Sequence, residues 1–279
     1  MSRILRTPFE KALAMVLLLI VGLVIIFPFI YMFASSLKES GDIVKVPPEL
    51  FPAVPRWTNY AEVLEVVPIG TQLVNSAIVT LGVTVGWLLT STLAGYAFAR
   101  LEFPGRDLLF SAFLGTLMVP FVVLIVPMYR IMVELSWVDK LVALIVPWVF
   151  TAYGTFLLRQ AFMNIPKELE EAAQIDGAGR WGTLFSVALP LVGPALATLA
   201  TLAFLYSWNS FTWPLIIISS PGTKVVTQGL MDLQALYAGT RLNLVLAGST
   251  LAVAPTLLAY LLAQRYFIEG VATTGLAGR

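Results

Sequence analysis

The chain has 279 residues, of which 58% are hydrophobic and 12% are charged. Soluble globular domains typically carry about 25% charged residues, so this composition excludes an ordinary soluble domain and indicates a protein solvated mostly by lipid. The 17 Lys and Arg nearly balance the 16 Asp and Glu, which gives no electrostatic basis for binding nucleic acid. Cysteine and histidine are absent, which excludes disulfides, thiolate or imidazole metal sites and the usual catalytic base near neutral pH.

Six apolar segments are long enough to cross a bilayer, which takes about 20 helical residues. Each must be helical, because a lipid-exposed segment has to satisfy its backbone hydrogen bonds internally. The first segment is too long for a cleaved signal peptide, so we expect it to be retained as a span. The sequence therefore predicts an all-α membrane protein with six transmembrane helices, over 12–36, 72–98, 108–129, 141–160, 191–218 and 243–264.

An even number of spans places both termini on the same side of the membrane. If that side is the cytoplasm, cytoplasmic segments hold ten of the 17 Lys and Arg residues, a modest excess with the sign that the positive-inside rule requires. We therefore expect both termini in the cytoplasm. The ten residues are Arg3, Arg6, Lys11, Arg100, Arg106, Arg159, Lys167, Arg180, Arg265 and Arg279.

The spans lack ionisable residues in their central portions. Ion- and proton-coupled transporters commonly place such residues in the membrane, so the sequence offers no obvious site for gradient coupling, although a simple anchor bundle would show the same absence. No phosphate-binding Gly-x4-Gly-Lys-Ser/Thr loop occurs in the chain. Any nucleotide chemistry must therefore come from another polypeptide.

The longest cytoplasmic segment, 160–190, predicts a short amphipathic helix. Asn164 is a plausible N-cap, Pro166 suits the first turn, and the helix should run to about Asp176, with Gly177 in a left-handed conformation. Periodicity alone favours an ordinary amphipathic helix lying on the membrane surface. The narrow small and apolar face consists of Leu169, Ala172, Ala173 and Asp176.

The same segment resembles the EAA motif of binding-protein-dependent ABC importer permeases. Glu171-Ala172-Ala173 is followed after three residues by Gly177, after nine more by Val187, and one residue later by Leu189-Pro190. The resemblance implies a coupling helix that docks in a cleft of an ATPase subunit. The docking and turn residues that it implies are Glu171, Ala172, Ala173, Asp176, Gly177 and Ala178.

Segments 94–105, 208–215 and 264–267 are similar to carbohydrate-uptake permeases of the maltose and glycerol-phosphate importer type. That resemblance implies the type I ABC importer permease fold, in a bacterial or archaeal plasma membrane. It implies three kinds of partner: a second, different permease subunit, two ATPase subunits and an extracytoplasmic solute-binding protein. It implies no catalytic residue, metal or cofactor in this chain, because ATP and Mg are used by the ATPase subunits.

Three regions follow from this organisation. Residues 1–71 hold the N-terminal tail, the first span and an extracytoplasmic loop; 72–265 form a five-helix core that includes the EAA loop; and 266–279 form a cytoplasmic tail.

The fifth span carries a polar and aromatic cluster ahead of Pro214, which removes a helical hydrogen bond and predicts a kink near Ser210. Hydroxyls, an amide and indoles at a helix break suit a sugar, although the indoles could instead belong to an interfacial aromatic belt. The predicted pathway residues are Tyr206, Trp208, Asn209, Ser210 and Trp213. Weaker candidates, more often packing residues, are Asn75, Ser76, Tyr153 and Thr155.

These observations predict a permease subunit of an ATP-driven, binding-protein-dependent sugar importer that forms half of the translocation pathway. The same architecture importing glycerol-phosphate or another polyol is the alternative, although a phosphate should want a cation along its path. A secondary transporter would need intramembrane charge. An intramembrane enzyme would need a catalytic pair of side chains within the spans.

Overall fold

The computed structural model describes residues 7–274, and side chains over 7–264. All regular elements in that range are helical, which confirms the all-α prediction. The predicted N-terminal and C-terminal tails lie partly outside the described residues. Helix α15 extends to Thr274 and so includes part of the predicted C-terminal tail, 266–279. The helices are α1 (Pro8–Ser36), α2 (Ser40–Ile43), α3 (Thr58–Val66), α4 (Ile69–Arg100), α5 (Arg106–Gly115), η1 (Thr116–Met118), α6 (Phe121–Glu134), α7 (Val142–Ile145), η2 (Val146–Trp148), α8 (Ala152–Met163), α9 (Lys167–Ile175), α10 (Arg180–Gly182), η3 (Thr183–Ala188), α11 (Leu189–Leu191), α12 (Gly193–Trp208), α13 (Thr212–Ile217), α14 (Val226–Tyr237) and α15 (Leu242–Thr274).

Three of the described helices are long and apolar enough to cross a membrane: α1, α4 and the Leu242–Gln264 part of α15. Three further pairs of helices pass the same test together but are bent at a short break. Counting each bent pair as one span gives six, in agreement with the number predicted from hydropathy.

The third predicted span is not one helix. The chain bends by 98° between Arg106–Met118 and Phe121–Glu134, so the prediction of one continuous helix over 108–129 is corrected. Pro120 causes the break, because proline has no N–H to donate and disfavours helical geometry at the residue before it. Val119 accordingly has extended backbone angles, φ −82° and ψ 115°.

The fifth predicted span also has different bounds. The helices that pass the test as a pair are Arg180–Leu191 and Gly193–Trp208, with a bend of 78°. The chain leaves the helix at Asn209 and resumes as α13, so 191–218 holds a helix, a break and a second short helix. The expected disruption of the helix near Ser210 is confirmed. Pro214 lies inside α13, and its carbonyl accepts a hydrogen bond from the backbone nitrogen of Ile218.

Contacts divide the chain into two compact units. One comprises Met1–Ile69 and Gly229–Val253, and the other Gly70–Gln228 and Ala254–Arg279. In the first unit, the apolar span of α1 is unburied by this chain, so it is free to meet lipid or another subunit. Buried Asn59 organises the end of α1, since its amide donates to the carbonyls of Ser36 and Lys38 at 2.8 and 2.9 Å.

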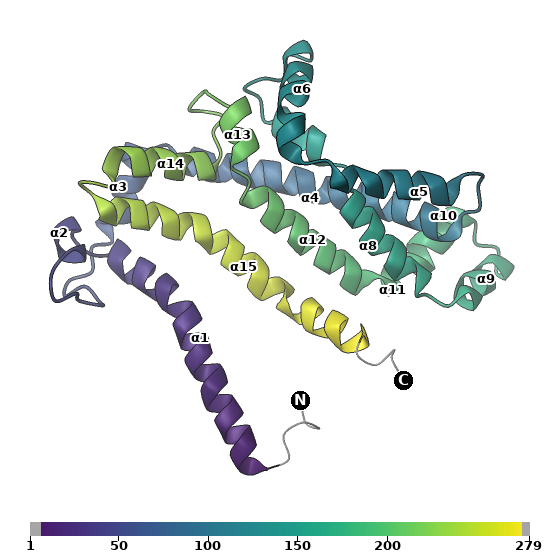
Figure 1. Ribbon diagram of the computed structural model, residues 1–279, viewed down its shortest axis with the longest axis horizontal. Helices are drawn as coiled ribbons and strands as arrows, with labels where there is room; N and C mark the ends of the chain where they lie inside the picture. Colours follow the sequence, from purple (N-terminus) through teal and green to yellow (C-terminus); the bar gives the residue numbers. More distant parts are fainter. Residues whose placement is uncertain (1–6, 275–279) are drawn as a thin grey trace. The chain divides into compact units, whose positions relative to one another are not determined.

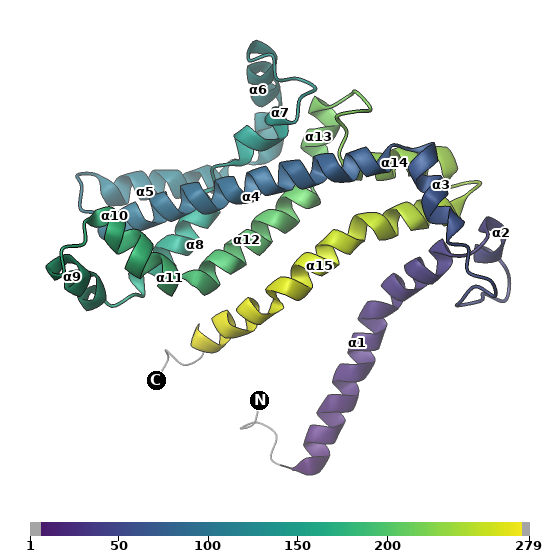
Figure 2. The same ribbon diagram turned by 180° about the vertical axis from the view of Figure 1, so that it is seen from behind.

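In the second unit, glycines let α4 approach the segment from α7 to α8 closely. A Cβ on Gly86 would lie 2.6 Å from Cγ1 of Val149, and one on Gly95 would lie 3.0 Å from the backbone nitrogen of Arg159. Figures 1 and 2 show the result: α8 and α12 lie along α4, with α9–α11 towards one end of α4 and α13 towards the other. The buried core between them includes Leu158, Phe162, Leu184, Leu199 and Ala203.

Gly86→Ala should destabilise the second unit by about 1–3 kcal/mol, because the added methyl group overpacks a contact that includes the Cα of Val149. The thermal unfolding midpoint of the purified chain in detergent should fall by several degrees. Gly115→Ala is the matched control, since a Cβ there has nothing within 4 Å. Equal midpoints for the two variants would contradict this account of the packing.

Candidate functional site

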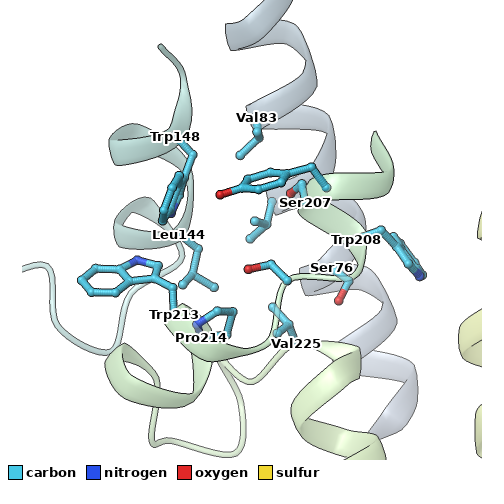
Figure 3. Close-up of a pocket in the computed structure, with 12 residues that line it drawn as sticks. Ser76, Val83, Leu144, Trp148, Ser207, Trp208, Trp213, Pro214 and Val225 are labelled. Atoms are coloured by element: carbon cyan, nitrogen blue, oxygen red, sulfur yellow. The ribbon is translucent and has the colours of Figure 1, made fainter. Parts of the chain in front are cut away.

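A narrow cleft lies in the second unit where α12 ends and α13 begins (Figure 3). It leaves room for about one water molecule, so a solute can enter only if its walls separate. None of its twelve lining residues is charged. They are Ser76, Val79, Val83, Leu144, Trp148, Tyr206, Ser207, Trp208, Ser210, Trp213, Pro214 and Val225.

Aromatic rings from five different elements pack at this cleft. The ring of Tyr206 lies between those of Trp87 and Trp148, with centroid separations of 5.4 and 5.8 Å. Phe121 continues the series, 5.2 Å from Trp148 and 6.2 Å from Trp213. Rings at these separations are in favourable contact, so the cluster ties α4, α6, η2 and the α12–α13 region together.

Two of the indole N–H groups stabilise this arrangement of rings through bonds to backbone carbonyls. Trp87 donates to the carbonyl of Trp148 at 2.5 Å, and Trp213 donates to the carbonyl of Ala143 at 2.9 Å. These two N–H groups are therefore engaged within the protein, and the cleft also presents ring surfaces and the hydroxyls of serine and tyrosine.

The predicted pathway residues are placed in two ways. Tyr206, Ser210 and Trp213 line the cleft, whereas Asn209 does not, because its amide donates to the carbonyl of Leu205 at 2.8 Å. Trp208 touches the cleft, but its ring is turned away from it (Figure 3).

Of the weaker candidates for the pathway, two lie at the cleft and two do not. Ser76 lines the cleft and Asn75 lies beside it, but Thr155 is buried and donates to the carbonyl of Thr151, and Tyr153 is exposed. Sequence reasoning did not indicate Trp148, and Ser207, although part of the polar cluster in the fifth span, was not among the predicted pathway residues. A Pro-Trp pair at 147–148, inside an apolar segment, is the signal that could have drawn attention to the former.

A connecting segment, residues 218–225, joins α13 to α14 and is tied to α4 at the cleft. We call it the strap. The amide of Asn75 donates to the carbonyls of Gly222 and Lys224 at 2.9 and 3.0 Å. Next to it, Ser76 Oγ accepts from the backbone nitrogen of Val226 at 2.8 Å.

Asp139 ties the strap to the turn between α6 and α7. Its Oδ1 accepts from the backbone nitrogens of Ser219 and Ser220, both at 2.9 Å, and from the hydroxyl of Thr223 at 3.0 Å, while Oδ2 accepts from the hydroxyl of Ser220. These donors hold the pKa of Asp139 well below its usual range. Asp139 has φ 63°, and its bonds offset the strain of that left-handed backbone.

The EAA segment forms a second candidate site. Helix α9 begins at Lys167 and Asn164 ends α8, so the prediction of Asn164 as the N-cap is wrong: its side chain caps no backbone group of α9, and Pro166 occupies that position. The C-terminal end is as predicted. Gly177 has φ +86°, and the nitrogen of Ala178 donates to the carbonyl of Ala173 at 2.9 Å, a helix-closing bond of the Schellman type.

The motif residues are accessible. Glu171, Ala172, Asp176 and Gly177 are exposed, while Ala173 and Ala178 are half-buried. Sequence reasoning missed the residue that fastens this helix, Glu170, which is 6% exposed. No periodic signal distinguishes it from its acidic neighbours.

The chain matches the family described as "Binding-protein-dependent transport system inner membrane component" over residues 82–272. It belongs to this family. One relative, the sn-glycerol-3-phosphate transport system permease protein UgpE of Pectobacterium atrosepticum, is 36% identical over 262 residues, which cover 91% of this chain and 93% of that protein. Another, the arabinooligosaccharides transport system permease protein AraQ of Halalkalibacterium halodurans, is 33% identical over 261 residues, which cover 92% and 93%.

The fold agrees with solved structures. A chain of a bacterial ABC transporter involved in the import of the acidic polysaccharide alginate superposes with a TM-score of 0.80 at 23% identity, covering 94% of this permease chain and 99% of that one. A chain of the alginate transporter in complex with its alginate-bound periplasmic protein superposes with a TM-score of 0.66 at 15% identity, covering 91% and 92%. The ABC importer permease fold predicted from sequence is therefore confirmed.

Asp139→Ala should release the strap from the α6–α7 turn. The backbone amides of Ser219 and Ser220 lose their acceptor, so we expect their hydrogen exchange to accelerate about five- to tenfold. Glu134→Gln, at an exposed residue paired with Arg130, serves as the control and should leave the exchange of the strap unchanged.

The hydrogen bonds to Asp139 also determine how the protection of the strap amides against hydrogen exchange depends on pH. A carboxylate with a depressed pKa stabilises the fold above its unfolded pKa, near 3.9, and loses that effect only as the pH falls through the lower folded value. Protection factors of the strap amides should therefore stay constant from pH 7 to about pH 5. Loss of protection within that interval would contradict the assignment.

Proposed function

We propose that this chain is one permease subunit of an ATP-driven, solute-binding-protein-dependent importer of a neutral sugar. A second, different permease subunit supplies the other half of the pathway, and two ATPase subunits use ATP and Mg, since this chain has no phosphate-binding loop of its own. Both termini and α9 lie in the cytoplasm of a bacterial or archaeal plasma membrane. The strap then lies on the extracytoplasmic side, where a binding protein delivers solute.

The observation that carries this proposal is the exposed EAA helix in a chain of this family. Small residues at Ala172 and Ala173 permit close approach of another backbone, and the carboxylate of Glu171 offers a charge to a basic partner residue. The left-handed turn at Gly177 lets the chain reverse directly after the helix and return to the membrane. A protruding helix with this shape suits insertion into a groove of an ATPase subunit.

The chemistry of the cleft supports a neutral sugar as the solute. Sugars present hydroxyl groups, which need hydrogen bonds, and C–H faces, which stack on aromatic rings. The cleft offers Ser76, Ser207, Ser210 and Tyr206 hydroxyls beside the ring of Trp148, with no charged side chain among its lining residues. The closed cleft must widen for passage, as alternating access between inward- and outward-facing states requires.

A second candidate substrate is glycerol-phosphate or another polyol, because a relative at 36% identity is named for sn-glycerol-3-phosphate transport. A polyol would use the same hydroxyls. A phosphate would want a cation, which this cleft lacks and the partner permease would have to supply. Competition of a neutral oligosaccharide and glycerol-3-phosphate for uptake separates the two candidates.

Affinity purification of the tagged chain in mild detergent should recover a second permease, an ATPase subunit and a binding protein. Gly177→Asp should lose the ATPase subunit and abolish uptake while the chain stays in the membrane, because a side chain is strained at φ +86°. Gly179→Asp is the matched control: its φ is −71°, it precedes α10 as an N-cap, and nothing lies within 4 Å. Recovery of this chain alone, in an active preparation, would contradict the proposal and favour a secondary transporter.

Tyr206→Phe should lower uptake about three- to tenfold at subsaturating sugar, because it removes one hydroxyl from the cleft and keeps the ring contacts with Trp87 and Trp148. Tyr153→Phe makes the same chemical change at an exposed residue outside the cleft and should leave uptake unchanged. Unaltered uptake in Tyr206→Phe would exclude its hydroxyl from the pathway.

A further inference from the structure

Helix α4 connects the cleft to the EAA segment without interruption. It supplies Ser76, Val79 and Val83 to the cleft and ends at Arg100, beside α9. Ser76 and Arg100 are separated by about 36 Å of helix at 1.5 Å per residue. All of these residues belong to the same compact unit.

The guanidinium of Arg100 binds the first turn of α9 and also the chain two residues before that helix begins. Its Nε lies 2.7 Å from Oε1 of Glu170, and its Nη2 donates to the carbonyl of Ile165 at 2.6 Å. The hydroxyl of Tyr96, one turn earlier on α4, lies 3.3 Å from Oε2 of Glu170. Both partners of the ion pair are sequestered, with side chains 8% exposed, so water screens it little.

Helix α9 therefore has two faces with different tasks. Glu170 points into the protein, whereas Glu168, Glu171 and Ala172 are exposed. The exposed face carries the EAA residues that the proposed function assigns to the ATPase. The inward face is held by α4, the helix that also forms a wall of the cleft.

We propose that Arg100 and Glu170 are positioning residues that transmit displacement of α9 to α4, and through α4 to the cleft. The inference rests on the proposed docking of an ATPase subunit on α9. A planar guanidinium that binds a carboxylate and a carbonyl in fixed directions resists both sliding and separation, which an apolar contact does not. Because α4 is one helix from Ile69 to Arg100, a push or pull at its end moves Val79 and Val83 with it.

The absence of cysteine from the sequence makes the test direct. Val79→Cys, a near-isosteric change, places a single thiol in the wall of the cleft. In proteoliposomes containing the full complex, the reaction of this introduced thiol with a membrane-impermeant maleimide is measured with and without ATP and vanadate. Recovery of the ATPase subunit and the rate of ATP hydrolysis are measured on the same preparations.

With the native ion pair, trapping with ATP and vanadate should change the labelling rate of the introduced thiol at least tenfold. Glu170→Gln should keep the ATPase subunit and ATP hydrolysis, abolish that change and lower uptake per ATP at least tenfold. Arg100→Gln should give the same results as Glu170→Gln. The double variant should lower uptake per ATP no further than either single variant, because both changes remove the same ion pair. Arg100→Lys keeps the charge and should retain part of the coupling if a glutamine variant fails to assemble.

Two other carboxylates supply the comparisons. Glu134→Gln, at an exposed residue of α6 that pairs with Arg130, should leave thiol labelling, ATPase recovery, ATP hydrolysis and uptake unchanged. Glu171→Gln should instead weaken recovery of the ATPase subunit, since it lies on the docking face. A normal ATP-dependent change in thiol labelling in Glu170→Gln, or loss of the ATPase subunit from both Arg100→Lys and Glu170→Gln, would overturn the inference. Failure of the native chain to recover any ATPase subunit would instead overturn the proposed function.

Discussion

Close contact between α4 and the segment from α7 to α8 is the constraint on which the second unit depends. Gly82, Gly86 and Gly95 remove side chains from that contact, so Ile145, Val149 and Leu158 pack against the backbone of α4. In lipid, where apolar surface is not driven together by water, such close approach of backbones is a principal source of helix association. Helix α4 is continuous while neighbouring pairs of helices bend, and this single helix reaches both candidate sites.

The two ends of α4 are fastened by different chemistry. Near its beginning, Asn75 binds the strap and Ser76 binds the first residue of α14 through neutral hydrogen bonds, and Asp139 binds the strap from the α6–α7 turn. At its end, the buried Arg100–Glu170 pair binds α9. A buried ion pair adds little net stability, because burying its charges costs solvation free energy. It holds its two partners in a fixed geometry, because separating them would leave a buried charge without a partner. The strap end of α4 is therefore held by neutral hydrogen bonds, and the end beside α9 is held by a buried pair of charges.

Hydropathy and motif spacing predicted much of this molecule. The six spans, the helix of the EAA segment and the left-handed Gly177 follow from local rules, since apolar length, breaker residues and backbone sterics act within a few positions of each other. The bend at Pro120 was missed because a hydropathy profile sums apolar residues and does not register where an apolar run changes direction. Proline signals a break but does not give its angle.

The sites were predicted less completely, for a physical reason. Whether Asn209 faces the cleft or caps its own helix depends on where α12 ends. In the structure its amide caps the helix by donating to the carbonyl of Leu205. Trp148 reaches the cleft through the packing of separate helices, which spacing along the chain does not encode. Glu170 differs from Glu171 by a single position, and only the location of Arg100, 70 residues away, decides which of the two is buried.

The most direct test of the account is transport by the purified complex in proteoliposomes loaded with ATP and supplied with sugar-bearing binding protein. We expect uptake that requires ATP on the side of α9, stops with vanadate, and continues when uncouplers remove all ion gradients. Uptake that persists without ATP and collapses with an uncoupler would contradict the assignment of this chain to an ATP-driven importer.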